Sequence, residues 1–200
     1  MLENYLIEYC SPTLASLKSG SLFNCRCPKN TNLEESISDW NAVLMTRGIS
    51  IHLLRRTDAA ALIYVYRRSA LRDTLSDPEI QSFLRGYGYD ACNCCRGCTS
   101  DKCSIENCLK HLEARITGGD GNTEMTFPHE IGIFLGYPLA DVAGFINNKG
   151  RNCKCTGAWK VYGDASYARK AFARFNKCSD VYNRLWRSGR RSVLQLTVAG

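Results

Sequence analysis

Cysteine clustering between residues 92 and 108 is the feature that most restricts what this chain can fold into. The segment reads CNCCRGCTSDKCSIENC, so six of the twelve cysteines fall within 17 positions. C-x-C pairs occur at Cys25/Cys27, Cys92/Cys94 and Cys153/Cys155, and Cys94 and Cys95 are adjacent. A disulfide between such close neighbours distorts the geometry that the bond prefers. The spacing therefore argues against a disulfide framework and favours thiolates that gather around a metal.

The rest of the sequence predicts a cytoplasmic protein with no membrane association. The opening residues, MLENYLIEYC, lack the basic and then apolar regions of a secretory leader. No apolar run approaches the roughly 18 residues needed to cross a bilayer. Cytoplasmic thiols are kept reduced, which again disfavours disulfides. Hydrophobic residues make up 44% of the chain and charged residues 22%, as in ordinary globular proteins. We expect one domain over residues 1–200, with residues 92–108 as a cysteine-rich insertion.

Hydrophobic periodicity predicts an α+β fold in which a mixed sheet of about five strands is flanked by helices. Apolar residues at helical spacing predict long helices, and β-rich runs bounded by turn residues predict strands. Two short helices are expected to meet at Gly136-Tyr137-Pro138. The other expected helices are 32–47, 69–75, 78–85, 101–116 and 165–187, and the expected strands are 21–27, 49–55, 60–67, 158–162 and 193–198.

The cysteine segment is the strongest candidate for a metal site. Thiolates are soft, strongly donating ligands that suit zinc and iron–sulfur clusters. Cys95 and Cys98 have the C-x2-C spacing in which two sulfurs grip one metal. Thiol redox chemistry, and simple burial of small side chains, remain open alternatives; Cys108 shares an apolar helical stripe with Ile105 and is equally well explained as core. The candidate ligands are Cys92, Cys94, Cys95, Cys98 and Cys103.

The other cysteines give weaker signals. Cys10 precedes Ser-Pro-Thr, where a helix can begin, and a helix N-terminus lowers a thiol pKa, so Cys10 is a candidate nucleophile. The Cys25/Cys27 and Cys153/Cys155 pairs each place two sulfurs on one strand face, which we interpret as incidental. Cys178 is expected in the core.

Residues 127–150 contain a second motif, FPHEIGIFLGYPLADVAGFINNKG, with three interpretations. A zinc-protease helix would need a second histidine four residues after His129, and position 133 is Ile. A helix-turn-helix over residues 128–148 has the right turn spacing but few base-reading side chains. We favour a structural helical corner whose apolar residues are core. The polar residues left over form a candidate pocket; these are His129, Glu130, Tyr137 and Asp141, joined by Lys149, Lys160 and Tyr162.

Positive charge is concentrated at the C-terminal end. Residues 151–200 hold eleven Lys and Arg against Asp164 and Asp180, whereas residues 1–150 hold fifteen against seventeen acidic residues. An acidic protein partner is therefore expected to dock on the polar face of the 165–187 helix, with nucleic acid as the less favoured partner. The expected docking residues are Lys170, Arg174, Lys177 and Arg184.

Several blocks resemble a bacterial family catalogued as domain of unknown function number 3793. The resemblance is carried by residues 127–150, by WKVYGD at 159–164, by CSPTLASLK at 10–18, by LIYVYR at 62–67 and by FLRGYGY at 83–89. It spans nearly the whole chain and implies a bacterial, cytoplasmic and anaerobic setting. Such a setting suits reduced thiols and iron–sulfur chemistry. The cysteine-rich segment departs from the family pattern and is interpreted as a local elaboration.

These observations favour a protein that binds a metal or iron–sulfur cluster in a redox or metal-handling pathway. One alternative is a small enzyme that uses a pocket around His129 and Glu130, or Cys10 as nucleophile. Another is a nucleic-acid-binding regulator that uses the helix-turn-helix-like segment 128–148. Whether the chain catalyses a reaction is left open by its sequence.

Overall fold

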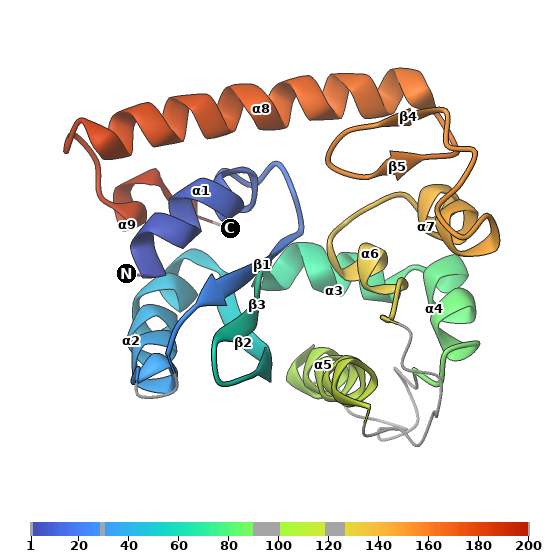
Figure 1. Ribbon diagram of the computed structural model, residues 1–200, viewed down its shortest axis with the longest axis horizontal. Coiled ribbons are helices and arrows are strands. Elements are labelled where there is room, and N and C mark those ends of the chain that lie inside the picture. Colours follow the sequence, from blue (N-terminus) through green and yellow to red (C-terminus); the bar gives the residue numbers. More distant parts are fainter. Residues whose placement is uncertain (1, 29–30, 90–100, 119–126, 200) are drawn as a thin grey trace.

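The computed structural model describes residues 2–28, 31–89, 101–118 and 127–199, without the side chains of residues 101–104 (Figure 1). The elements are α1 (Leu2–Leu14), β1 (Gly20–Arg26), α2 (Leu33–Leu44), the 3-10 turn η1 (Met45–Arg47), β2 (Ile49–Arg56), β3 (Ala60–Arg67), α3 (Arg68–Ser76), α4 (Pro78–Arg85), α5 (Asp101–Thr117), α6 (Ile131–Phe134), α7 (Leu139–Asn147), β4 (Cys155–Thr156), β5 (Lys160–Val161), α8 (Ala165–Arg187) and α9 (Val193–Leu196). Helices predominate, and the strands fall into two groups, β1–β3 in the first third of the chain and β4–β5 before the long helix α8.

The main sheet has three antiparallel strands in the order β1-β3-β2. β2 and β3 form the predicted hairpin, and β1 pairs with the other edge of β3, so that Leu22 faces Tyr64. The central strand is buried on both faces, because its sequence, AALIYVYR, is apolar and aromatic at nearly every position. Such a continuous run is typical of a strand that is covered on both sides.

The predicted α+β class is confirmed, but the five-stranded mixed sheet is wrong. In the described residues, β4 and β5 pair only with each other, and the main sheet has three strands. The expected strand 193–198 is instead α9, because Ser192 and Gln195 form a capping box that starts a helix.

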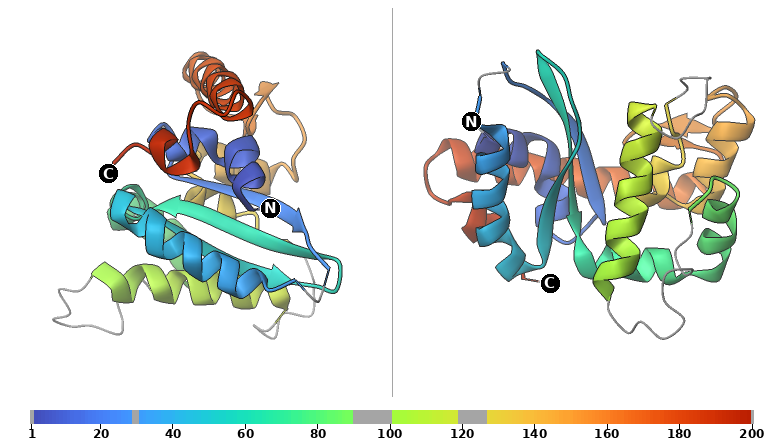
Figure 2. Two further views of the ribbon diagram at one scale, coloured as in Figure 1. Left: turned by 90° about the vertical axis from the view of Figure 1, so that its left-hand side faces the viewer. Right: turned by 90° about the horizontal axis from the view of Figure 1, so that it is seen from below.

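Two hydrophobic clusters lie on opposite faces of the sheet, and β3 contributes to both (Figure 2). Ile63 and Val65 pack with α1, α2 and α9, while Tyr64 and Tyr66 pack with α3 to α7. This division follows from the alternation of side chains along a strand. A third, smaller cluster joins the β4–β5 hairpin to α8 around Trp159.

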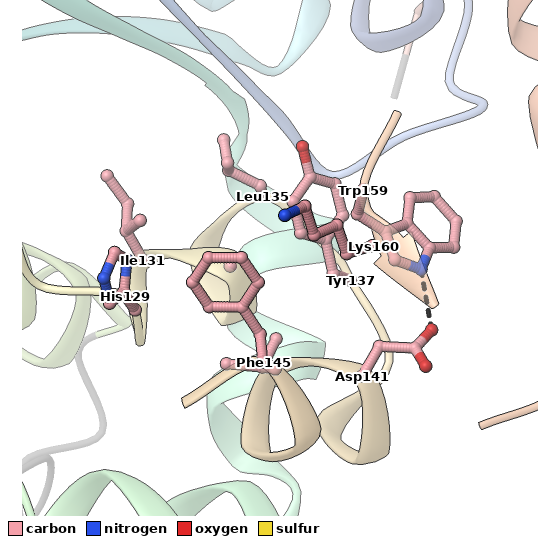
Figure 3. A pocket seen from close by; sticks show the side chains of 10 residues that line it. His129, Ile131, Leu135, Tyr137, Asp141, Phe145, Trp159 and Lys160 are labelled. Atoms are coloured by element: carbon pink, nitrogen blue, oxygen red, sulfur yellow. Dashed lines mark hydrogen bonds between the residues drawn. The ribbon is translucent and has the colours of Figure 1, made fainter. Parts of the chain in front are cut away.

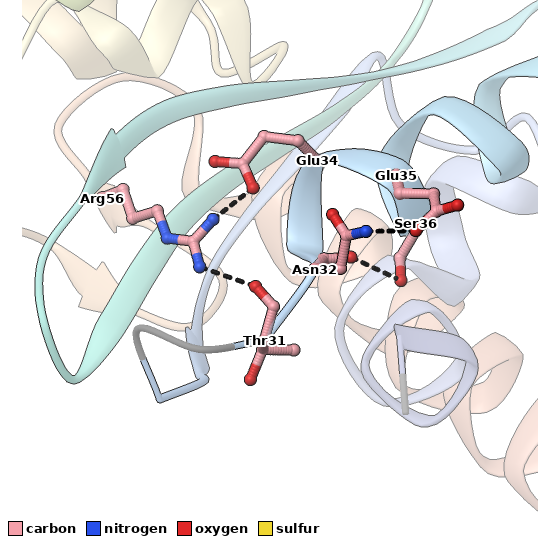
Figure 4. A network of polar contacts seen from close by, with 6 residues as sticks. All are labelled: Thr31, Asn32, Glu34, Glu35, Ser36 and Arg56. Carbon is pink, nitrogen blue, oxygen red and sulfur yellow. Dashed lines mark hydrogen bonds and ion pairs between the residues drawn. The ribbon is translucent and has the colours of Figure 1, made fainter.

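A polar network fixes the start of α2 against the end of β2 (Figure 4). Arg56 on β2 pairs with the Glu34 carboxylate and donates from Nη2 to the Thr31 carbonyl oxygen at 2.7 Å. Asn32 donates to Glu35, and Ser36 Oγ donates to the Asn32 carbonyl oxygen at 3.1 Å. The network ties a loop to the sheet edge over which α2 packs.

α8 is a 23-residue helix along the outer edge of the molecule, running from the β4–β5 hairpin towards α9 (Figure 1). Asp164 caps its N-terminus by accepting from the backbone N–H groups of Ser166 and Tyr167. Its inner face packs against α1 and the hairpin. Across the described residues, no helix combines enough length with enough apolar character to cross a bilayer.

Candidate functional site

A cavity of about 170 Å³ lies where α6, α7 and the β4–β5 hairpin meet (Figure 3). Its wall is largely aliphatic and aromatic. Imidazole, ammonium, phenol and carboxyl groups come from four of its residues. The lining residues are His129, Ile131, Gly132, Leu135, Tyr137, Asp141, Val142, Phe145, Trp159 and Lys160.

Two glycines allow α7 to fold back closely over α6. Gly136 has a φ of 76°, a left-handed conformation that glycine adopts without strain. Gly132 lies so close to α7 that a Cβ there would be 2.8 Å from Val142 Cγ2. Pro138, with its φ near −55°, then precedes the first residue of α7. The local sequence thus builds the corner beneath the cavity.

Asp141 on α7 is the polar anchor of the site. Its Oδ2 atom accepts a hydrogen bond from Trp159 Nε1 at 2.6 Å, and Oδ1 accepts from the backbone N–H groups of Tyr162 and Gly163, both at 2.7 Å. The side chain is buried, with 3% of its surface exposed. All of this carboxylate's contacts serve to hold the hairpin on α7.

An aromatic stack forms one wall. The Tyr137 ring stacks on the Trp159 indole with centroids 5.0 Å apart, and Phe172 of α8 meets the indole edge-on at 4.5 Å. Lys18 Nζ lies 5.0 Å from the Tyr137 ring centroid, and burial lowers the pKa of this lysine to about 8. The indole is therefore held both by packing and by its hydrogen bond to Asp141.

His129 and Lys160 approach the cavity on either side of the Phe145 ring (Figure 3). The imidazole meets that ring edge-on, with centroids 4.8 Å apart. Lys160 Nζ lies 5.8 Å from the ring centroid and donates to the Gly150 carbonyl oxygen at 2.8 Å. Since Asp141 already accepts three hydrogen bonds, the polar side chains of the lining that remain for a ligand are the imidazole, the ammonium and the Tyr137 phenol.

The structure brings together four of the seven residues predicted for this pocket: His129, Tyr137, Asp141 and Lys160. Lys149 is exposed and outside the lining. Tyr162 contributes its backbone N–H to Asp141, and its side chain does not line the cavity.

Glu130 also lies outside the lining, because its buried carboxylate points into another network. It accepts a hydrogen bond from Tyr89 Oη at 3.1 Å and pairs with Arg115 of α5 at 2.5 Å. Among the described residues, no carboxylate forms an ion pair with His129. The pairing of His129 with Glu130 that an acid–base site would need is therefore not formed.

Trp159 and Phe145 were not predicted as site residues, although both supply much of the wall. Trp159 belongs to the WKVYGD run that carried part of the family resemblance. That resemblance was the one feature of the sequence that could have identified Trp159 as a site residue. Its role depends on the contact with Asp141, which lies 18 residues earlier.

Four of the five predicted metal ligands, Cys92, Cys94, Cys95 and Cys98, lie outside the described residues. Cys103 falls in α5, but its side chain is also outside the description. Among the described residues, no group of three His, Cys, Asp or Glu side chains is placed to hold a metal ion. Metal binding by the cysteine segment therefore stays a prediction.

Cys10 does not stand at a helix start, contrary to prediction. It lies inside α1, which begins at Leu2, and it is fully buried. Burial raises the pKa of its thiol to about 12, the opposite of nucleophile activation. Cys25 and Cys27 are buried in the core, whereas Cys153 and Cys155 are half-buried. Cys178 is buried as predicted and donates to the Ser11 carbonyl oxygen at 3.5 Å.

The four predicted docking residues on α8 are all exposed, but they do not lie on one common surface. Arg184 lines an open groove between α1 and α8 together with Glu8 and Asp180. Lys170, Arg174 and Lys177 lie in the N-terminal half of the helix, outside that groove.

The geometry of segment 128–148 does not favour a helix-turn-helix. α6 is a single turn of four residues, and α7 packs against β5 with Asp141 and Val142 buried. A recognition helix needs an exposed face that can enter a groove of DNA, and the start of α7 is instead packed against β5.

Comparison with known proteins agrees with the resemblance seen in the sequence blocks. The family model described as Protein of unknown function (DUF3793) matches residues 6–197. No curated protein and no solved structure matches the chain.

Proposed function

The chain belongs to this DUF3793 family, which carries no assigned activity, and from the site's geometry we propose that it binds a small organic anion with one ring in the cavity. The observation that carries the proposal is an apolar cavity of about 170 Å³ whose lining includes the Lys160 ammonium, with the His129 imidazole and the Tyr137 hydroxyl as further polar groups. An apolar cavity of about 150 Å³ can hold one benzene molecule. The volume therefore suits a single ring.

The wall supports recognition of a flat ring. Tyr137, Phe145 and Trp159 present aromatic surfaces, and aromatic pairs prefer the offset or edge-on contacts that a bound ring can make with them. Asp141 and Phe172 hold the indole in place, so the wall is formed before a ligand enters. Preorganisation of this kind lowers the cost of binding.

The charge around the cavity supports an anionic substituent. Lys160 lines the cavity, and Lys149, Arg151 and Lys154 are exposed in the neighbouring α7–β4 segment. The negative charge of Asp141 is partly offset by the three N–H dipoles that point at its carboxylate. A carboxylate or phosphate on the ring would meet the Lys160 ammonium, whereas an amine would be repelled.

The test is a titration of ¹⁵N-labelled protein with benzoate, benzyl alcohol and benzylamine, followed by the indole N–H resonance of Trp159. A W159F variant identifies that resonance. We expect benzoate to shift it at lower concentrations than benzyl alcohol, and benzylamine to have the weakest effect. The K160Q variant should lose most of the preference for benzoate over benzyl alcohol.

The F145A variant should lose binding of both rings, because it removes one aromatic wall. F83A removes a comparable half-buried ring far along the chain in α4 and should bind like the wild type. Absence of any Trp159 shift with ligands at about 10 mM would contradict the proposal, since even weak ring ligands are detectable there.

Metal binding by Cys92, Cys94, Cys95, Cys98 and Cys103 is a second proposal, supported by their spacing in the sequence. Protein purified without oxygen should contain near-stoichiometric zinc or iron, and C95S/C98S should lose most of it. C153S/C155S removes two half-buried thiols elsewhere and should retain the metal. Metal-free wild-type protein of full stability would contradict this proposal.

A further inference from the structure

We propose that the N-terminal half of α8 binds single-stranded nucleic acid, with basic side chains contacting phosphates and Tyr167 stacking on a base. This surface, the α8 ridge, consists of Tyr167, Lys170, Arg174 and Lys177 on one side of the helix, with Arg169 at its border. It is separate from the cavity, and the inference does not depend on the ligand proposed there.

The charge of the α8 ridge is unusually one-sided. Between Ala165 and Ser179 the helix has four basic residues and no acidic one. Over the wider stretch 142–179, which includes the β4–β5 hairpin, eight Lys and Arg occur with Asp164 as the single acidic residue. Asp164 is occupied as the helix cap, accepting from Ser166 and Tyr167. A surface with this excess of positive charge complements a polyanion.

The α8 ridge is also accessible. α8 forms the outer edge of the molecule in two perpendicular views, and the four basic side chains are exposed (Figures 1 and 2). Within the described part of the chain, none of the four forms an ion pair that would neutralise it. Ten residues separate Tyr167 from Lys177, so the ridge is about 15 Å long.

Tyr167 favours a nucleic acid over an acidic protein. Its side chain is 58% exposed on the first turn of α8, one turn before Lys170 and two turns before Arg174. Single-stranded nucleic acids are bound by grooves or ridges in which cations contact the backbone and exposed aromatic rings stack on bases. An acidic protein could also contact the ring, but the regular alternation of phosphates and stacked bases in a single strand matches a row of cations beside an exposed ring.

The test is fluorescence anisotropy with a labelled 12-nucleotide thymidine oligomer at several salt concentrations. Four phosphate contacts predict a slope of log K against log salt of about −3. R174Q/K177Q should make the slope shallower by about 1.4. Y167A should weaken binding roughly 5- to 150-fold while leaving the slope unchanged, since it removes stacking without removing charge.

R55Q/K110Q is the matched control, because it also removes two exposed cations but from β2 and α5, on the other side of the molecule. It should bind the oligomer like the wild type. The proposal is overturned if the control weakens binding as much as R174Q/K177Q. It is also overturned if Y167A binds normally, or if heparin fragments or anionic vesicles bind while the oligomer does not. Circular dichroism of each variant verifies its fold.

Discussion

Asp141 holds three parts of the chain together with one carboxylate. Through its hydrogen bonds to Trp159, Tyr162 and Gly163 it joins α7 to β5 and to the turn before α8. All three partners donate, so a side chain that only accepts is required at this position. Asp141, which the sequence placed among the polar residues of a candidate pocket, therefore also has a structural role.

We expect D141N to lower the free energy of unfolding by about 2 to 3 kcal/mol. Whichever way the new amide turns, its NH₂ group meets an N–H donor. Urea unfolding at pH 7 measures the change. D180N, which alters an exposed aspartate of α8, should stay within about 0.5 kcal/mol of the wild type. Equal stability of D141N and D180N would contradict the role given to Asp141.

Lys18 predicts a specific pH dependence. Burial lowers its pKa in the folded protein from 10.5 to about 8, so between these values the unfolded chain binds more protons than the folded chain. Its contribution to stability is therefore complete above pH 10.5 and is lost as the pH falls through 8. K18M has no charge to bury, and its stability advantage over the wild type should shrink as the pH rises from 8 to 10.5. A gap that is constant with pH in urea unfolding would refute this.

At the level of elements, Arg67 connects the end of β3 to both termini of the chain. Its Nε donates to the Thr13 carbonyl oxygen at 2.7 Å, and Nη2 donates to the carbonyl oxygens of Leu14 at 2.6 Å and Val198 at 2.8 Å. The side chain is 2% exposed. It thus adds a second donor to the carbonyl groups of Thr13 and Leu14 at the end of α1, which also accept from the backbone N–H groups of Ser16 and Val198.

Replacing Arg67 with lysine should lower the free energy of unfolding by about 3 kcal/mol. One ammonium cannot serve three carbonyl groups as a guanidinium fork does, so buried charge-assisted hydrogen bonds are lost, although Thr13 and Leu14 keep backbone donors from Ser16 and Val198. Hydrogen exchange should also show faster exchange of the Val198 amide, which donates to Leu14. R68K, at the half-exposed neighbouring position, is the control. Unchanged exchange at Val198 in R67K would show that the clamp is unimportant.

Most helices and the central hairpin were predicted well, including the short helices α3 and α4, but α1, α9 and the β4–β5 pairing were not. The predicted helix 165–187 coincides with α8, and the predicted hairpin coincides with β2 and β3 to within a residue at each end. β4 and β5 have two residues each, too few for alternation to be recognised. Residues 193–198 were predicted as a strand because most of them are apolar. The prediction overlooked Ser192 and Gln195, whose capping box marks the start of α9.

At the scale of the whole molecule, the two large hydrophobic clusters share the strand β3. Ile63 belongs to one cluster and its neighbour Tyr64 to the other, and Tyr64 Oη also donates to the Phe134 carbonyl oxygen at 2.5 Å. Loss of β3 would expose both clusters at once. The single domain expected over residues 1–200 stays a prediction, and a strand shared by two clusters gives a way to test it.

I63A and L112A test this expectation, because they remove fully buried side chains from different clusters. Each should cost about 2 to 5 kcal/mol and shift one common unfolding transition. Circular dichroism and tryptophan fluorescence should then give coincident curves for both variants. Two separate transitions, with each variant shifting only one, would instead indicate two independently folding units.

The sequence by itself determined most helices, the central hairpin and the presence of a polar set in segment 129–141. These features depend on local periods of 3.6 and 2 residues, which are written along the chain. Only the tertiary structure decided which polar groups meet. It directed Glu130 to Arg115, Asp141 to Trp159 and Arg67 to Val198, and so left His129 and Lys160 beside the cavity. The physical reason is that partners 15 to 131 residues apart are selected by packing around a shared core, and local periodicity carries no information about that choice.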